Sequence, residues 1–135
     1  MLKRWKMLVL IFAAVLVFAC MGTAIADAIM PRYEHVNIMR CSLNFENGRA
    51  VAWGMVSADR SLPTSVVVKL KQYYEGEWRT IGSWSGSTSI GVAEAGGSEE
   101  IDQGFDYIVY VEGTVKDTNG NILETVSGHT DVRSY

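Results

Sequence analysis

Cysteine and histidine are scarce in this chain of 135 residues, which contains two of each. These two residue types supply most protein ligands for zinc. Neither histidine has a cysteine or a second histidine at the spacing of a metal site. The sequence therefore predicts no metal site, and it contains no motif for a cofactor.

Basic clusters are absent beyond the first six residues, and the formal net charge of the whole chain is −3. A nucleic-acid-binding surface needs a patch of Lys and Arg that neutralises several phosphates. A negative chain without such a patch repels a phosphate backbone. We therefore expect no nucleic-acid partner.

The N-terminus has the three parts of a secretory signal peptide. Three basic residues among the first six precede a long uncharged apolar run. Ala24 and Ala26 then stand at positions −3 and −1 of an A-x-A cleavage site before Asp27. This pattern predicts a signal peptide over residues 1–26 and a secreted, extracellular mature protein, which meets the membrane only transiently through that peptide.

Two alternatives for the N-terminus remain open. Met7 to Ala26 is a stretch of 20 residues without a charge, which at about 1.5 Å per residue is long enough to remain as a membrane anchor. Cys20 would be the lipidated residue of a lipoprotein, although the bulky Phe18 fits such a motif poorly. Cleavage is the favoured interpretation, because the apolar core ends at Met21 before the cleavage site.

The mature chain suits one domain over residues 27–135. Its nine Lys and Arg against fifteen Asp and Glu give a net charge near −6. A chain of this length can bury a core without covalent crosslinks. Cys41 is its only cysteine, so no intramolecular disulfide is expected. Cys41 alternates with Leu43 and Phe45, which predicts a small buried side chain and not a reactive thiol.

Strands and tight turns dominate the mature sequence, with almost no helical periodicity. Asn47-Gly48, between two alternating segments, is a strong signal for a hairpin over residues 38–57. Two further hairpins are predicted from segments that alternate apolar and polar residues on either side of a turn. They are a strand from Ser65 with a partner over 78–85, turning at 74–77, and a strand over 105–116 with a partner over 121–127, turning at 117–120.

The strand count predicts an all-β sandwich. Residues 85–98 are mostly Gly, Ser and Ala, which predicts a mobile connection with room for one short edge strand. With a first strand over 33–36, the total reaches about seven or eight short antiparallel strands at regular spacing, which is typical of two packed sheets.

One local pattern makes the predicted sandwich immunoglobulin-like. Tyr107 lies near the start of a strand, and Val109 lies two residues further on, after Ile101 and Gly104. In immunoglobulin-like domains a corner tyrosine at this place donates its hydroxyl to upstream backbone, and the residue two positions later points into the core. The core tryptophan of a facing strand would then be Trp78 or Trp84, which have the same parity and are expected on one face.

Four segments carry a resemblance to a known family: residues 66–72, 76–85, 104–109 and 117–124. In the spacing of their aromatic, glycine and turn residues they resemble a family of small secreted proteins from Gram-positive bacteria that is known only as a domain of unknown function. Asp106 and Ile108 depart from the family pattern, in which a further aromatic residue and an Arg are expected. The resemblance implies a signal peptide followed by one β-sandwich, and it implies no activity.

The sequence contains only weak candidates for a set of catalytic residues. His129 and Asp131 lie near each other in sequence, but no nucleophile elbow or oxyanion motif accompanies them. Glu99, Glu100 and Asp102 precede the predicted corner tyrosine, and paired carboxylates can hydrolyse glycosides. A secreted hydrolase that uses this acidic loop is therefore kept as an alternative, while a solvated turn explains the three residues more simply.

Aromatic residues are the remaining functional signal. Several are expected on neighbouring strands: Trp53, Tyr73, Tyr74, Trp78, Trp84 and Tyr110. Strand parity places Tyr73 and Tyr110 on outward faces, where exposed rings can stack on sugars. The sequence thus predicts a secreted, non-enzymatic binding or interaction protein, with Tyr73 and Tyr110 as candidate ligand-binding residues. The expected partner is a polysaccharide or a cell-surface protein. The first alternative, ahead of the hydrolase, is a carbohydrate or cell-wall binding module that uses exposed aromatic residues.

Overall fold

The computed structural model describes residues 33–135. The predicted signal peptide, its cleavage site and Cys20 lie outside the described residues. Within residues 33–135, no helix is long and apolar enough to cross a membrane.

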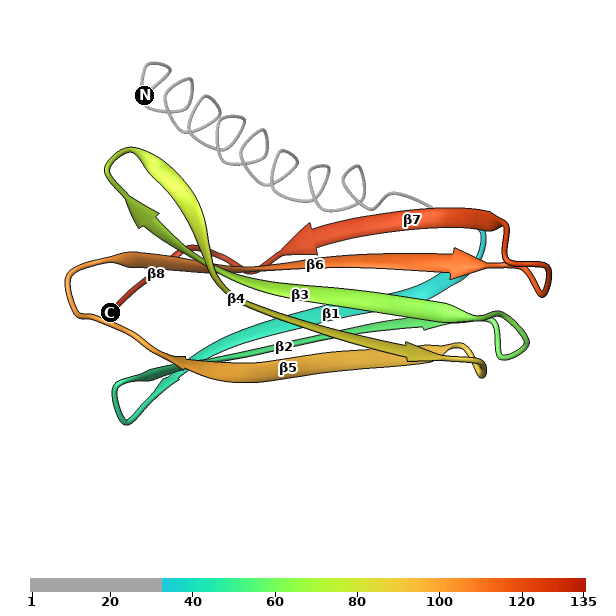
Figure 1. Cartoon of the computed structure of the whole chain (residues 1–135), viewed down its shortest axis with the longest axis horizontal. Helices are drawn as coiled ribbons and strands as arrows, with labels where there is room; N and C mark the ends of the chain where they lie inside the picture. The colour runs from blue at the N-terminus through green and yellow to red at the C-terminus, as the bar shows by residue number, and fades with distance from the viewer. Residues whose placement is uncertain (1–32) are drawn as a thin grey trace, which may run out of the picture. The chain divides into compact units, whose positions relative to one another are not determined.

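Eight strands make up the described domain (Figure 1). Every strand pairing is antiparallel. The strands are β1 (Val36–Glu46), β2 (Arg49–Ala58), β3 (Thr64–Tyr74), β4 (Glu77–Thr88), β5 (Val92–Glu100), β6 (Asp106–Lys116), β7 (Ile122–His129) and β8 (Arg133–Ser134).

The strands form two sheets that pack as a sandwich. The smaller sheet has the order β1-β2-β5, and the larger sheet has the order β4-β3-β6-β7, with the short β8 also paired to β6. The chain thus places its first hairpin in one sheet and its second in the other, returns to the first sheet with β5, and ends in the second. This arrangement confirms the predicted immunoglobulin-like all-β fold.

Two of the predicted turns have the backbone that a tight hairpin needs. Asn47 and Gly48 have φ of 50° and 76°, and Glu75 and Gly76 have φ of 50° and 82°. Two successive residues with positive φ match the right-handed twist of the strands that they join. The predicted turn over residues 117–120 likewise joins β6 to β7.

Alternation along the strands builds the core between the sheets. In β3, every second residue from Thr64 to Gln72 is buried, and β6 buries Tyr107 and alternate residues after it. The smaller sheet contributes mainly small side chains from β2, so the two sheets approach closely. The fully buried core side chains of 2 % exposure or less include Ala50, Ala52, Val56, Val66, Val68, Leu70, Tyr107, Val109, Val111, Val115 and Val126.

The glycine-rich segment at 85–98 contains the predicted edge strand, β5, but it is not the mobile connection that the sequence also predicted. β4 continues to Thr88, and β5 pairs with β2 along its whole length. The reason is a close approach: a Cβ on Gly97 would collide with Nε1 of Trp84, so the indole occupies the space of the missing side chain. The glycines here make room for packing. The predicted strand over 33–36 is also wrong, because β1 begins only at Val36, and the short β8 was not predicted.

A β-bulge in β4 separates the two tryptophans that sequence parity placed on one face. The register of β4 against β3 shifts after Leu70, which leaves Ile81 without a partner. One extra residue reverses the side to which later side chains point. Trp84 therefore packs against the core, whereas Trp78 lies outside, opposite Tyr73, and is 39 % exposed.

The predicted tyrosine corner is present. The hydroxyl of Tyr107 donates to the backbone oxygen of Asp102 at 2.8 Å and accepts from Nε2 of Gln72 at 2.9 Å. Oε1 of Gln72 in turn accepts from Nε of Arg79 at 2.9 Å. Val109 is fully buried, as predicted. This chain of hydrogen bonds ties the start of β6 to β3 and β4 and satisfies the buried amide of Gln72.

Cys41 behaves as a packing residue. It lies on β1 in partial contact with the core, and it forms no disulfide in the described part of the chain. Burial raises the pKa of the Cys41 thiol, because a thiolate is poorly solvated there. A raised pKa disfavours the nucleophilic form, which agrees with the predicted structural role.

Candidate functional site

The outer face of the larger sheet carries both candidate tyrosines. Tyr73 on β3 and Tyr110 on β6 are 42 % and 39 % exposed, which confirms their predicted outward orientation. Tyr110 is paired in register with Lys69. Tyr73 is four residues further along β3, or about 13 Å at the usual rise of a strand. The two rings thus belong to separate parts of one face.

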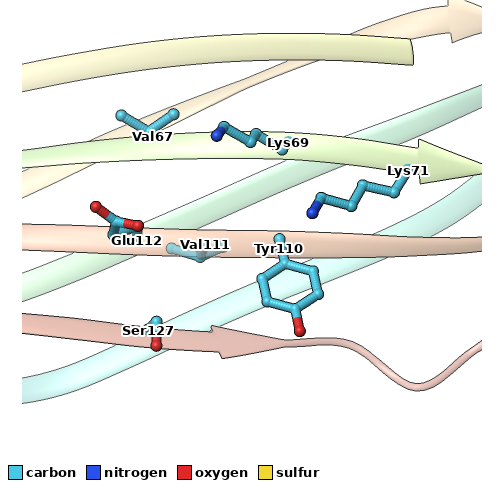
Figure 2. Close-up of a pocket in the computed structure, with 7 residues that line it drawn as sticks. All are labelled: Val67, Lys69, Lys71, Tyr110, Val111, Glu112 and Ser127. Atoms are coloured by element: carbon cyan, nitrogen blue, oxygen red, sulfur yellow. The ribbon is translucent and has the colours of Figure 1, made fainter. Parts of the chain in front are cut away.

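A shallow groove surrounds Tyr110. Its volume is about 300 Å³, and it is lined by Val67, Lys69, Lys71, Tyr110, Val111, Glu112 and Ser127 (Figure 2). Figure 2 shows the two lysines on β3, Tyr110 and Glu112 on β6, and Ser127 on β7. β3 and β6 are paired on both sides, so the backbone that carries these groups is held firmly. We call this site the Tyr110 groove.

Neighbouring side chains hold the ring of Tyr110 in place. Nζ of Lys71 lies 4.7 Å from the ring centroid, a cation–π contact. The ring of His129 on β7 lies 5.3 Å away, and its Nδ1 is 2.8 Å from the backbone oxygen of Thr130. A carbonyl can only accept, so this contact requires a proton on Nδ1. Lys71 and His129 thus cover part of the ring of Tyr110, and the rest of the residue stays exposed.

Tyr73 belongs to a second group of rings near the tip of the β3/β4 hairpin. Its ring centroid lies 5.2 Å from that of Trp78, with 59° between the planes. On the opposite side of the same hairpin, the guanidinium of Arg79 lies 4.2 Å from the ring centroid of Tyr74, which is 5.9 Å from that of Phe105. The sequence did not predict that Trp78 would join Tyr73, because the bulge was not visible in it.

The Tyr110 groove has a positive character within a negative protein. Lys69 and Lys71 take part in none of the ion pairs within 4.0 Å that residues 33–135 form. Glu112 is the only carboxylate in its lining. Both lysines alternate with the buried residues of β3 and therefore lie on its outer side. The pairing of β3 with β6 is what brings them to Tyr110.

Trp53 lies on the other outer face of the sandwich. It is on β2, opposite Ser42 of β1 and Gly96 of β5, and its neighbours Ala52 and Gly54 point inward. A separate groove of about 420 Å³ lies beside it. The aromatic residues singled out in the sequence therefore do not form one row.

Glu99 and Glu100 of the acidic loop do not face each other. Glu99 and Glu100 are consecutive on β5, so they point to opposite sides of the strand. Glu100 lies 3.5 Å from Arg49, and Asp102 offers its backbone oxygen to Tyr107. Two carboxylates that face each other across a cleft are what glycoside hydrolysis requires. Within residues 33–135, no three His, Cys, Asp or Glu side chains gather as metal ligands would.

Comparison with known proteins gives little beyond this geometry. No family model and no curated protein matches the chain. Among solved structures, the chain is similar to the solution structure of CsgH from R. palustris, with a TM-score of 0.44 and 10 % sequence identity. That match covers 70 % of this chain and 92 % of CsgH. The resemblance to a Gram-positive family of secreted proteins stays a prediction.

Proposed function

We propose that this chain is a secreted, non-enzymatic binding protein that holds its ligand on the outer face of the larger sheet. The observation that carries the proposal is the Tyr110 groove, where two ammonium groups, a phenol and a hydroxyl project from three adjacent strands. The extracellular location rests on the N-terminal sequence, which has the pattern of a cleaved signal peptide.

The chemistry of the groove supports binding. Lysine ammoniums attract anionic groups, the hydroxyls of Tyr110 and Ser127 exchange hydrogen bonds, and the tyrosine ring and Val67 offer apolar contact. All of these groups except Ser127 stand on the interior strands β3 and β6, so little backbone has to be ordered when a ligand binds. The exposed pair Tyr73 and Trp78 extends the same face toward the β3/β4 hairpin. The partner in this proposal is a polysaccharide or a cell-surface protein.

The test maps binding onto the two outer faces. Isotope-labelled protein is titrated with peptidoglycan fragments, soluble plant and bacterial polysaccharides, and purified surface proteins, and amide chemical shifts are followed by NMR. The proposal expects shifts on β3, β6 and β7 with a binding ligand. Tyr73→Ala and Tyr110→Ala should each weaken that binding by on the order of 1 kcal/mol, or about fivefold.

Trp53→Ala is the matched control, because it removes an aromatic side chain from the opposite outer face. It should leave affinity unchanged, provided that its thermal melt shows a folded protein. Shifts confined to β1, β2 and β5, or equal binding by the parent and both tyrosine variants, would show that the face has been assigned wrongly.

A further inference from the structure

We infer that the Tyr110 groove selects acidic carbohydrate, specifically a chain of uronic acid residues. This inference rests on the proposed function and deepens it, because it names the ligand class of the same face. Three features of the groove support it: two lysines that form no ion pair within residues 33–135, a single carboxylate, and the ring of Tyr110.

The cations are the first feature. Lys69 and Lys71 follow each other on the outward side of β3 and form no ion pair within residues 33–135. The structure describes one other lysine, Lys116, which lies at the far end of β6. A protein with a net charge of −3 thus gathers two of its three described lysines in one groove. A ligand with carboxylates complements these two ammoniums, and a neutral glycan leaves them unused.

The carboxylate of Glu112 is the second feature. It faces outward from β6 in the same groove, beside Ser127 of β7. A carboxylate accepts hydrogen bonds from hydroxyl groups and repels closely spaced phosphates or sulfates. The ligand should therefore combine a low density of acid groups with many hydroxyls. Uronic acid chains have both properties, with one carboxylate per sugar ring. Nucleic acids and heavily sulfated chains carry a higher density of negative charge, which the carboxylate of Glu112 would repel.

The ring of Tyr110 is the third feature. Lys71 of β3 and His129 of β7 contact it, and part of the residue is still exposed. The C–H groups of a pyranose ring match the remaining ring surface and the side chain of Val67, which lines the same groove. An acidic peptide offers carboxylates without this combination of apolar ring face and hydroxyls, so carbohydrate is favoured over peptide.

The experiment compares two ligands that differ in whether their carboxylates are free or methyl-esterified. Hexagalacturonate and its methyl ester share the same rings, and only the first carries carboxylates. Isothermal titration with the purified full-length protein should give an affinity for the acid at least about tenfold higher than for the ester. The affinity for the acid should fall as salt is raised, because exposed charges are screened.

Three variants locate the charge effect. Lys69→Gln and Lys71→Gln should each weaken hexagalacturonate binding by about three- to tenfold, since each removes a charge-assisted hydrogen bond at an exposed site. Lys116→Gln is the control, because it removes the same charge from the same sheet outside the groove, and it should change the affinity less than about twofold. Glu112→Gln should strengthen binding of heparin, a denser anion, more than that of hexagalacturonate.

The outcomes separate this inference from the proposed function. Equal binding of acid and ester, or acid binding that is weakened no more by the groove variants than by Lys116→Gln, would overturn the acidic-carbohydrate inference while leaving a binding face in place. Poly-glutamate that binds through Lys69 and Lys71 as tightly as hexagalacturonate would overturn it in favour of an acidic peptide. Failure of both saccharides to bind also overturns it, and the mapping experiment above then judges the proposed function separately.

Discussion

Tyr107→Phe removes one oxygen atom from the centre of the tyrosine corner and leaves the buried ring in place. Two hydrogen bonds disappear with that oxygen, the one donated to Asp102 and the one accepted from Gln72. The Asp102 oxygen belongs to an exposed loop residue, where water can replace the lost donor. Gln72 is 3 % exposed, so its Nε2 loses a partner that water does not easily replace.

The expected cost follows from these two environments. A typical protein hydrogen bond contributes about 1 kcal/mol net, and a buried polar group left without a partner costs about 1–3 kcal/mol. We therefore expect Tyr107→Phe to lower the free energy of unfolding by about 2 kcal/mol, which is above the 1 kcal/mol or so that a single corner hydrogen bond implies. For a domain of this size, about 2 kcal/mol corresponds to a fall in melting temperature of roughly 10 °C.

Urea denaturation followed by tryptophan fluorescence measures this cost. Tyr73→Phe is the control, because its hydroxyl is exposed and makes no hydrogen bond within residues 33–135, and it should leave the midpoint unchanged. In a double-mutant cycle, Tyr107→Phe and Gln72→Met together should cost about 1 kcal/mol less than the sum of the single variants, because they share one hydrogen bond. A loss below about 0.5 kcal/mol for Tyr107→Phe, or strict additivity in the cycle, would refute the reasoning.

Three further expectations concern packing, reactivity and processing. Gly97→Ala should destabilise the domain by about 1–3 kcal/mol and shift its tryptophan emission, because the new methyl group would displace the indole of Trp84; an unchanged melt and spectrum would argue against that contact. Burial raises the pKa of Cys41, so its alkylation by iodoacetamide at pH 8 should be slower in the folded protein than in urea and should accelerate as the pH rises toward the raised pKa; equal rates in both states would contradict a buried thiol. Mass spectrometry of protein from the culture medium should find Asp27 at the N-terminus, and recovery only in membranes, with a retained leader or a lipidated cysteine, would count against secretion.

Local chemistry made most of the fold predictable. The turn at Asn47 and Gly48 is encoded in two residues whose positive φ suits a tight hairpin, so it can be recognised without knowledge of the rest of the chain. Strand parity likewise placed Tyr73 and Tyr110 outward, and the spacing around Tyr107 identified the corner. Each of these predictions depends on residues within one strand or one turn.

The features that the sequence did not predict correctly are those that depend on the pairing of one strand with another. β5 was predicted only as one short edge strand within a mobile connection, because glycine and serine have low strand propensity. The full strand exists through its pairing with β2 and its fit against Trp84. The bulge at Ile81 was missed because the register between β3 and β4 is set by both strands together. Of the Tyr110 groove, the sequence predicted the outward-facing Tyr110 but not the lysines beside it. These lysines of β3 meet Tyr110 through pairing between strands more than 30 residues apart.

Because Ile81 has no partner in β3, the number of residues in β4 determines which side of the sheet its two tryptophans face. The length of a loop has no such effect. Loops tolerate insertions and deletions because no side chain depends on their count. Removing Ile81 would restore an unbroken ladder with β3, and the strand would then have to turn either its first half or its second half over. In one case Trp78 would be driven into the interior, and in the other Trp84 would be turned out into water. Among relatives of this chain, a β4 that is one residue shorter should therefore be accompanied by a small or polar residue at one of these two positions.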